Sequence, residues 1–294
     1  MGLNPIQIGM LRWYDATTAN EVTVCNSPSG LAFDGQDIWV SCIGSSKVTR
    51  VRPSDGTVLG MLDLGANAAA GSITFDGANL WIPTQAGDIR QVRTRDGAVL
   101  NAFPTSGNAT ALAYDGASLW AAAPSRDMVL QFAGKGNLFI GAVSLPSGGG
   151  PSGLAYDGAN MWITHQGTRT VTKVRATDTV LLGTFAVGSN PAGIAFDGKY
   201  MWIANSGDNT VSQLLANDGS HVQTIPVDMR PTGVAFDGNC IWVTNQAGNS
   251  VTKVRVRDSA QIGTFPVGPG PTGIAFDGAN IWVANTGGNT ISKR

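Results

Sequence analysis

Seven positions at one fixed place in an internal repeat carry the side chains with which this chain could bind a ligand. Each follows the second short apolar segment of its repeat, and together they are Cys42, Thr84, Ala123, His165, Asn205, Asn245 and Asn285. Because an Asn side chain both donates and accepts hydrogen bonds, a ring of them could bind a hydroxylated ligand or ordered water. Asn also stabilises left-handed turns by bonding to its own backbone, so a purely structural interpretation of the ring stays open.

Nucleophilic or metal chemistry at these positions is not expected. His165 is the only histidine of the ring, because His221 falls near the third turn of its repeat and is expected at the opposite end of the molecule. In a closed ring of seven units Cys42 and His165 are separated by about 150°, whereas a nucleophile and its base need heavy atoms within about 3 Å. We therefore interpret His165 as a hydrogen-bonded loop residue, and we predict no catalytic residue and no metal site.

The ring positions belong to a repeated stretch whose clearest copy is residues 274–285, IAFDGANIWVAN. Six earlier copies begin at Leu31, Ile73, Leu112, Leu154, Ile194 and Val234. The Asp residues of successive copies are 42, 39, 42, 40, 40 and 40 residues apart. A fixed period of this length is typical of repeat architectures, in which one unit cannot bury its own apolar faces and stacks on its neighbours.

Each repeat contains short apolar segments separated by Gly, Asn, Asp and Pro, without a ten-residue stretch of helical spacing. In the copy from Pro191 the segments are residues 193–196, 200–204, 210–215 and 221–227, and the Asp197–Gly198 pair predicts a tight turn. Four antiparallel strands in about forty residues form one blade of a β-propeller. The sequence therefore predicts one all-β domain over residues 1–294, a single seven-bladed β-propeller with four antiparallel strands in each blade.

The ends of the chain predict how the ring closes. The blades are expected at residues 28–67, 70–106, 109–148, 151–188, 191–228, 231–268, and 271–294 together with 11–25. Asp15 lies 19 residues before Asp34, just as Asp178 lies 19 residues before Asp197. The last repeat therefore stops at the position from which the N-terminal segment continues the pattern. We expect the N-terminal segment to supply the fourth strand of the last blade, which removes exposed sheet edges.

The Asp, Trp and basic residues of the repeat are predicted to be structural. Each Trp lies between apolar neighbours five residues after its Asp and is assigned to packing between blades, while each Asp is assigned to its turn. Trp13, outside the repeat register, is expected to be partly exposed. The basic residues of the third strands are interpreted as a solvated rim that protects the sheets. They include Lys47, Arg50, Arg52, Arg90, Arg93, Lys173, Arg175, Lys253 and Arg255.

Composition narrows the classes of partner. The net charge is -1 and 13% of the residues are charged, so no concentrated basic surface exists for nucleic acid or an anionic membrane. No uncharged apolar run approaches the roughly 20 residues of a membrane helix. We expect a soluble monomer with no nucleic-acid partner and no membrane insertion.

The cysteines and the N-terminus bear on the compartment. Cys25, Cys42 and Cys240 are scattered without a C-x-x-C pair, so neither a zinc ribbon nor a dense disulfide framework is predicted, and their redox state stays open. Residues 1–10 lack the basic start and apolar core of a signal peptide. We expect an exported or cell-surface protein of a bacterium whose leader is absent from this chain, with a cytoplasmic protein as the alternative.

The pattern P-x-G-I-A-F-D-G-x-x-I-W-V-A-N-x-x-x-N-T-V resembles the repeat of bacterial β-propellers of the YVTN and NHL types. The resemblance covers essentially the whole chain, is strongest from Pro151 onward, and is loosest at residues 72–133, where Pro83, Ala123 and Pro124 depart from the pattern. It implies relatives as different as virginiamycin B lyases, calcium-dependent lactonases and bacterial surface or sensor domains. Fold alone does not choose among these functions.

Two of the activities that the resemblance implies come with a ligand set. Lactonase-like propellers are expected to hold calcium with Glu, Asn and Asp, and the lyases to use a His and Glu pair with magnesium. Glu21 is the only Glu, and its register places it in an outermost strand, so neither set carries over residue by residue. Asp can replace Glu as an oxygen ligand, and Asp88, Asp127 and Asp208 lie in the relevant loops, so a divalent cation such as calcium stays open.

We therefore predict a non-catalytic binding or protein-interaction scaffold without a cofactor, which takes a polar neutral ligand such as a glycan, or a protein surface, at the channel mouth. The alternative is a metal-assisted lyase or lactone hydrolase with a site at the same mouth involving His165. A third interpretation is that the near-identical late repeats reflect recent amplification or engineering, with no evolved ligand. The predicted ligand-binding residues are Cys42, Thr84, His165, Asn205, Asn245 and Asn285.

Overall fold

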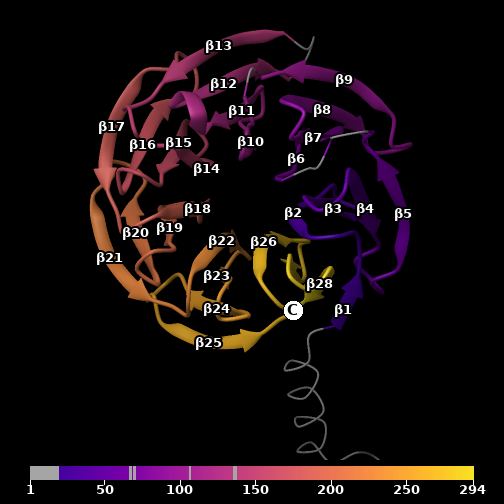
Figure 1. The fold of residues 1–294 in the computed structure, drawn as a ribbon. Coiled ribbons are helices and arrows are strands. Elements are labelled where there is room, and N and C mark those ends of the chain that lie inside the picture. The colour runs from indigo at the N-terminus through magenta and orange to yellow at the C-terminus, as the bar shows by residue number, and fades with distance from the viewer. Residues whose placement is uncertain (1–19, 66–67, 69–70, 106, 135–137) are drawn as a thin grey trace, which may run out of the picture.

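The computed structural model describes residues 20–65, 68, 71–105, 107–134 and 138–294. Within this part of the chain, 28 strands form seven four-stranded antiparallel sheets, and the only helix is the short 3-10 turn η1 (Pro124–Arg126). The sheets are arranged as blades around a central axis (Figure 1). The predicted all-β, seven-bladed propeller is confirmed. No helix among these residues is long and apolar enough to cross a membrane.

The strands of each blade run from the central axis to the circumference. The innermost strands are β2 (Pro28–Phe33), β6 (Thr74–Phe75), β10 (Leu112–Tyr114), β14 (Pro151–Tyr156), β18 (Pro191–Phe196), β22 (Pro231–Phe236) and β26 (Pro271–Phe276). The second strands are β3 (Ile38–Cys42), β7 (Asn79–Pro83), β11 (Ser118–Ala123), β15 (Asn160–His165), β19 (Tyr200–Asn205), β23 (Cys240–Asn245) and β27 (Ile281–Asn285). The third strands are β4 (Lys47–Val51), β8 (Asp88–Arg93), β12 (Met128–Ala133), β16 (Thr170–Arg175), β20 (Thr210–Leu215), β24 (Ser250–Arg255) and β28 (Thr290–Lys293). The outermost strands are β5 (Val58–Asp63), β9 (Val99–Pro104), β13 (Phe139–Ser144), β17 (Leu181–Ala186), β21 (His221–Pro226), β25 (Gln261–Pro266) and β1 (Asn20–Thr23).

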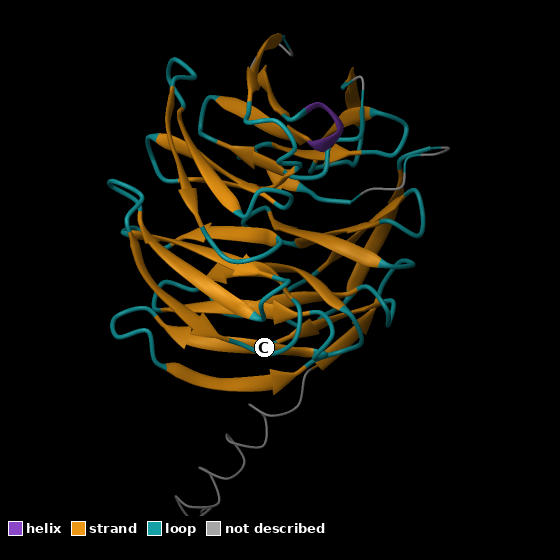
Figure 2. Cartoon of the chain, turned by 60° about the vertical axis from the view of Figure 1, so that its left-hand side comes forward, coloured by secondary structure: helices purple, strands orange, loops and turns teal. Residues whose placement is uncertain are grey.

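The loops of the propeller gather at the two ends of the strands (Figure 2). One end, here called the connector face, holds the loops between second and third strands. It also holds the connections that lead from each outermost strand to the innermost strand of the next blade. The opposite end holds the Asp-Gly turns and the turns between third and outermost strands. The predicted ring positions, at the ends of the second strands, therefore lie on the connector-face side.

The N-terminal strand β1 closes the ring. It pairs antiparallel with β28, with Glu21 opposite Ser292, so the last blade has the strand order β26-β27-β28-β1. The amide of Val24 continues the pairing by donating to the carbonyl of Asn289. The predicted closure is confirmed from residue 20 onward, and Glu21 lies in an outermost strand as expected. Residues 11–19, including Trp13, lie outside the described part of the chain.

The Asp of every blade binds the Trp of the same blade. In blade 5, Asp197 Oδ1 accepts the turn amides of Lys199 and Tyr200, and its Oδ2 accepts the indole N–H of Trp202 at 2.6 Å. The other six Asp–Trp pairs repeat this geometry at 2.7 Å. The Trp side chains are 0–8% exposed and lie in the apolar clusters of the blades. The structural roles assigned to both residues are confirmed, and the fixed five-residue spacing follows from this hydrogen bond.

We expect Asp197→Ala to lower the free energy of unfolding by about 3 kcal/mol, because an unsatisfied buried donor costs about 1–3 kcal/mol and the fully buried Trp202 would lose its acceptor. Urea denaturation monitored by Trp fluorescence measures the change. Asp178→Ala is the matched control, because Asp178 pairs with Arg175 on the surface and such exposed pairs contribute less than about 1 kcal/mol. Equal losses in the two variants would contradict the assignment of Asp197.

Most of the basic residues in or next to the third strands fall into two sets. Arg52, Arg93, Arg175 and Arg255 pair with the Asp three residues later at the surface, as expected for a solvated rim. In blades 1, 4 and 6 the side chain two residues before this Arg instead lies over the Trp of its blade, with ring distances of 5.2 Å for Arg50, 5.2 Å for Lys173 and 4.5 Å for Lys253. Lys293 of the last blade lies over Trp282 in the same way, at 5.5 Å.

The solvated interpretation is therefore wrong for Lys173, which is only 7% exposed. Its Nζ donates to the backbone carbonyls of Ala216 and Asn217 in the next blade. The packed stem and the cation over the indole ring stabilise the contact between these blades.

Candidate functional site

The predicted ring positions lie at the ends of the second strands, but their side chains are buried inside the blades. The exposed fraction is 2% for Thr84 and 0% for Cys42, Ala123, His165, Asn205, Asn245 and Asn285. None of them is among the residues that line the central cavity. Side chains without exposed surface do not contact a ligand in this conformation.

The three Asn side chains join the second strand of the blade to the third. Asn205 Nδ2 donates to Thr210 Oγ1 at 3.0 Å and to Ser212 Oγ at 2.9 Å, five and seven residues later. Asn245 and Asn285 make the same two contacts with the hydroxyls that follow them. This arrangement supports the structural interpretation of the Asn ring, although the bonds run to side chains of the next strand instead of the turn backbone.

The other ring positions bond in related ways. His165 Nε2 makes a 2.8 Å hydrogen bond with Thr172 Oγ1, which takes the place of the Asn–Ser contact of blade 5. Cys42 forms a disulfide with Cys25, with a Cα–Cα distance of 6.0 Å. Thr84 donates its hydroxyl hydrogen bond to the Asp88 carboxylate. Each ring residue with a polar or sulfur-containing side chain is thus used within the fold.

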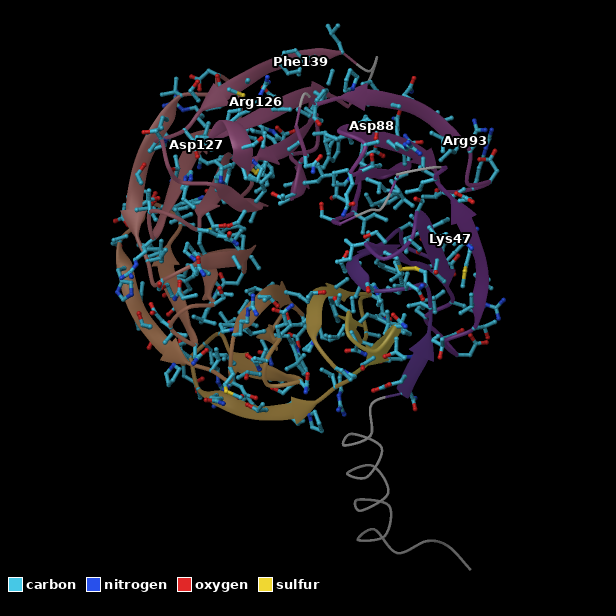
Figure 3. All side chains as sticks on the ribbon, in the orientation of Figure 1. Lys47, Asp88, Arg93, Arg126, Asp127 and Phe139 are labelled. Carbon is cyan, nitrogen blue, oxygen red and sulfur yellow. A yellow bond between two sulfur atoms is a disulfide. The ribbon has the colours of Figure 1, made fainter. Side chains whose placement is uncertain are left out.

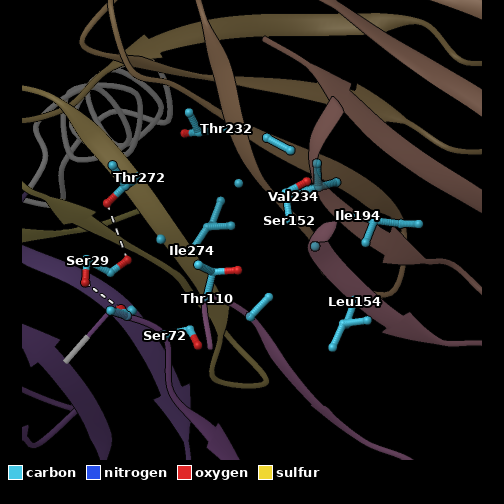
Figure 4. Close-up of a pocket in the computed structure, with 18 of the residues that line it drawn as sticks. Ser29, Ser72, Thr110, Ser152, Leu154, Ile194, Thr232, Val234, Thr272 and Ile274 are labelled. Carbon is cyan, nitrogen blue, oxygen red and sulfur yellow. Dashed lines mark hydrogen bonds between the residues drawn. The ribbon is translucent and has the colours of Figure 1, made fainter. Parts of the chain in front are cut away.

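The cavity itself is lined by all seven blades around the central axis, with residues of the innermost strands or, in blades 2 and 3, residues just before them (Figure 4). Its volume is about 400 Å³. Hydroxyl groups come from the second position of five blades, namely Ser29, Thr110, Ser152, Thr232 and Thr272, and from Ser72 one position later in blade 2. Aliphatic side chains come from the fourth position of every blade, namely Leu31, Ile73, Leu112, Leu154, Ile194, Val234 and Ile274. The cavity wall therefore carries a ring of hydroxyl groups, here called the hydroxyl belt, and a ring of aliphatic side chains, here called the aliphatic belt.

The hydroxyl belt also joins neighbouring blades. Ser152 Oγ donates to Pro191 O at 2.9 Å, and Thr232 Oγ1 donates to Pro271 O at 3.3 Å. Thr272 closes the ring by donating to Ser29 O at 3.3 Å. A donating hydroxyl keeps lone pairs on its oxygen, so the belt still offers acceptors to a ligand.

Glycine lets the innermost strands approach one another. A Cβ atom at Gly193 would lie 2.3 Å from Thr232 O, and one at Gly273 would lie 2.2 Å from Ser29 O. Real Cβ atoms do not approach backbone oxygens so closely, so a side chain at either position would push two blades apart. The Gly that follows the hydroxyl position therefore sets the width of the channel.

Gln166 is the residue that reaches the cavity from the connector face. It is exposed in the turn that directly follows buried His165, the last residue of β15. The equivalent residues of the other blades are Ile43, Gln85, Pro124, Ser206, Gln246 and Thr286. Sequence reasoning chose the last residue of each second strand and did not consider the one after it, because both faces of these strands are buried and the pattern does not mark which turn residue reaches the cavity.

No titratable side chain lines the cavity in the described part of the chain. The same residues contain no cluster of three or more His, Cys, Asp or Glu that could hold a metal ion. The three loop Asp residues are separately engaged: Asp88 with Thr84, Asp127 with the amides of Gly148 and Gly150, and Asp208 with the amide of Ser189. The structure does not bring these carboxylates together.

The pKa values of His165 and Asp127 are both lowered, but for different reasons. Desolvation lowers the pKa of His165 below its ordinary value, with an opposing effect from Asp127. The backbone amides of Gly150 and Gly148 hold the pKa of Asp127 below its usual range. Near neutral pH His165 is therefore a neutral, buried imidazole and Asp127 an anion.

Comparison with known proteins shows the fold. Neither a protein-family model nor a curated protein sequence matches this chain. Among solved structures, it is similar to a streptogramin B lyase, with a TM-score of 0.81 and 17% identity over 94% of this chain and 96% of that chain. Selenomethionine-substituted virginiamycin B lyase from Staphylococcus aureus gives a TM-score of 0.81 and 18% identity over 94% of this chain and 98% of the other.

A catalytically inactive histidine-to-alanine variant of the same lyase with quinupristin gives a TM-score of 0.80 and 19% identity, over 94% of this chain and 98% of that chain. Identity at this level supports no transfer of activity or of site residues. The chain has the β-propeller fold of these lyases over nearly its whole length.

Proposed function

We propose that the chain is a non-catalytic binding module that takes a polar neutral ligand of the glycan class at the connector-face mouth of the channel. The proposal rests on the composition of the cavity wall, which combines hydroxyl groups, the Gln166 amide and an aliphatic belt with no titratable side chain. Ligand sites are commonly apolar surfaces with a few placed polar groups, and glycans present both hydroxyls and C–H faces. The wall is therefore suited to a neutral ligand better than to an ionic one.

The size of the cavity supports the same proposal. Its volume of about 400 Å³ lies within the roughly 300–1,000 Å³ of typical small-molecule sites. Gln166 offers both a donor and an acceptor at the rim, and the hydroxyls of Thr232 and Thr272 offer acceptors deeper in the channel. A sugar ring could then bond at the mouth and pack its apolar face against Ile274 and Val234.

The Cys25–Cys42 disulfide supports the proposal that the protein is exported. Disulfides form and persist in oxidising compartments and are rare in cytosolic proteins. Export from a bacterium would place the channel mouth where it meets extracellular or surface glycans.

Binding to neutral glycans tests this proposal. We expect a glycan array to show neutral ligands, and calorimetry to show that Gln166→Ala and Thr232→Val each weaken binding about tenfold, roughly the loss of one good hydrogen bond. Thr177→Val is the matched control, because Thr177 is exposed in a turn of the opposite face. The proposal fails if no neutral glycan binds, or if both cavity variants bind as tightly as the control.

A lyase is the second candidate, favoured by the structural likeness to virginiamycin B lyase. The positions of the His and Glu residues do not support lyase activity, because His165 is buried, His221 lies in outermost strand β21, and Glu21 lies in outermost strand β1. A His and Glu pair is therefore not assembled. Incubation with quinupristin and magnesium, followed by mass spectrometry, should leave the antibiotic intact, and conversion to a product would establish the lyase instead.

A further inference from the structure

The connection between β13 and β14 covers His165. Residues 145–150 read Leu-Pro-Ser-Gly-Gly-Gly, and Gly148 and Gly150 adopt positive φ angles of 77° and 57°. A Cβ atom at Gly149 would lie 2.7 Å from His165 Nδ1, so the connector backbone passes directly over the imidazole. Gly149 is itself buried. Only a chain without side chains at these positions can close over the ring in this way.

The imidazole is held as a neutral group. It has no exposed surface, and its Nδ1 has no hydrogen-bond partner among the described residues, while Nε2 bonds to Thr172. A neutral imidazole has one donor and one acceptor, whereas the imidazolium has two donors and a full charge. A buried charge without a paired group is strongly unfavourable, so protonation conflicts with the closed connector.

Asp127 holds the same connector in place. It ends the loop between β11 and β12 at a left-handed φ of 48°, and Figure 3 labels it in blade 3. Its Oδ2 accepts the amide of Gly148 at 2.7 Å, and its Oδ1 accepts the amide of Gly150 at 2.9 Å. Asp127 also acts electrostatically on His165. The carboxylate that fastens the connector is therefore the natural partner of an imidazolium.

The other charged groups near His165 are exposed. The elements next to it are β14, which pairs with it at Pro151, β16, the connector and the loop that contains η1. Arg126 of that loop and Arg169, which precedes β16, have exposed side chains, and residues 145–150 contain no charged group. Lys173 lies farther along β16, over the ring of Trp162. Asp127 is thus the charged group that we expect to move when His165 becomes protonated.

We propose that His165 and Asp127 form a pH-sensitive latch, in which a neutral imidazole keeps the connector at residues 145–150 closed and an imidazolium opens it. On protonation, the imidazolium competes with the amides of Gly148 and Gly150 for the Asp127 carboxylate. The connector then lifts from β15 and uncovers His165 beside Gln166. The latch goes beyond the proposed binding function, and its test needs no ligand.

The direction of the pH dependence follows from burial. Desolvation lowers the pKa of His165 in the closed form, while in the open form it returns toward its ordinary value of about 6.5. The open form therefore binds a proton more readily. Closure is fully favoured above about pH 6.5, and below it the closing equilibrium weakens by up to tenfold per pH unit, until the lowered pKa of the closed form is reached.

Amide hydrogen exchange measured by NMR tests the latch. Between about pH 7.5 and about pH 5.5, we expect the protection factors of Gly148 and Gly150 to fall about tenfold. The amides of Arg230 and Gly270 are internal controls, because Asn209 and Asn249 hold them at the same place in blades without this histidine. His165→Asn introduces the residue that blades 5 to 7 carry at this position, and it should abolish the pH dependence.

The latch is overturned if Gly148 and Gly150 keep constant protection factors, or if His165→Asn shows the same loss as the unmodified chain. Should the variant not fold, the imidazole ¹⁵N shifts of the unmodified chain decide the matter. We expect His165 to titrate below about pH 6.5 together with the loss of protection, and titration of His165 at or above about pH 6.5 would refute the latch.

Discussion

Deleting residues 1–25 should leave the chain without a stable fold. The deletion removes β1, so β28 loses its antiparallel partner, and it also removes Cys25 and with it the disulfide to Cys42. The disulfide alone is expected to contribute about 2–4 kcal/mol, and a typical domain has only about 5–15 kcal/mol in total. Circular dichroism and calorimetry should therefore show a melting transition lowered sharply or absent.

Restoring the missing strand in trans provides the control. A synthetic peptide of residues 1–25 added to the deleted chain should recover much of the transition, because the edge of β28 remains free to accept a strand. The same peptide with Val22→Asp should recover less, since Val22 packs against the apolar cluster that contains Trp282. A deleted chain that melts cooperatively within a few degrees of the full chain would contradict the importance of this closure.

Breaking the Cys25–Cys42 disulfide should lower the free energy of unfolding by about 3 kcal/mol, as expected for a loop of this length. The two cysteines are 17 residues apart in sequence. Cys25 lies in the connection from β1 of the last blade to β2 of the first, and Cys42 ends β3, so the bond fastens the closing strand to the first blade. Urea denaturation of the chain, and of Cys25→Ser/Cys42→Ser, measures the difference.

The repeat itself supplies a matched variant. In blade 5 the Gly188 amide donates to Asn205 Oδ1 at 3.1 Å, where blade 1 has the disulfide. The hydroxyl of Thr49, equivalent to Ser212, has no hydrogen-bond partner in the described structure. Cys25→Gly/Cys42→Asn should therefore be more stable than the double Ser variant by about 1 kcal/mol. A double Ser variant as stable as the oxidised chain would show that the disulfide contributes nothing to closure.

The sequence by itself determined the number of blades, the strand order and the roles of the repeated Asp and Trp. These features depend on local contacts, because the Asp197 carboxylate bonds amides two and three residues away and an indole five residues away. Because the pattern occurs once in each blade, the number of its copies gives the number of blades. The register between Asp15 and Asp34 in addition indicated that the N-terminus completes the last blade, which β1 confirms.

Only the tertiary structure decided which side chains meet the channel and which connect the blades. Buried His165 and exposed Gln166 are adjacent in sequence, and they differ because β15 ends at His165 and Gln166 lies in the exposed turn that follows. The disulfide, the contact of Lys173 with the next blade, and the cover that Gly149 places over His165 join residues 16 to 44 positions apart. Such contacts depend on how neighbouring blades pack against one another, and a repeat pattern does not encode that geometry residue by residue.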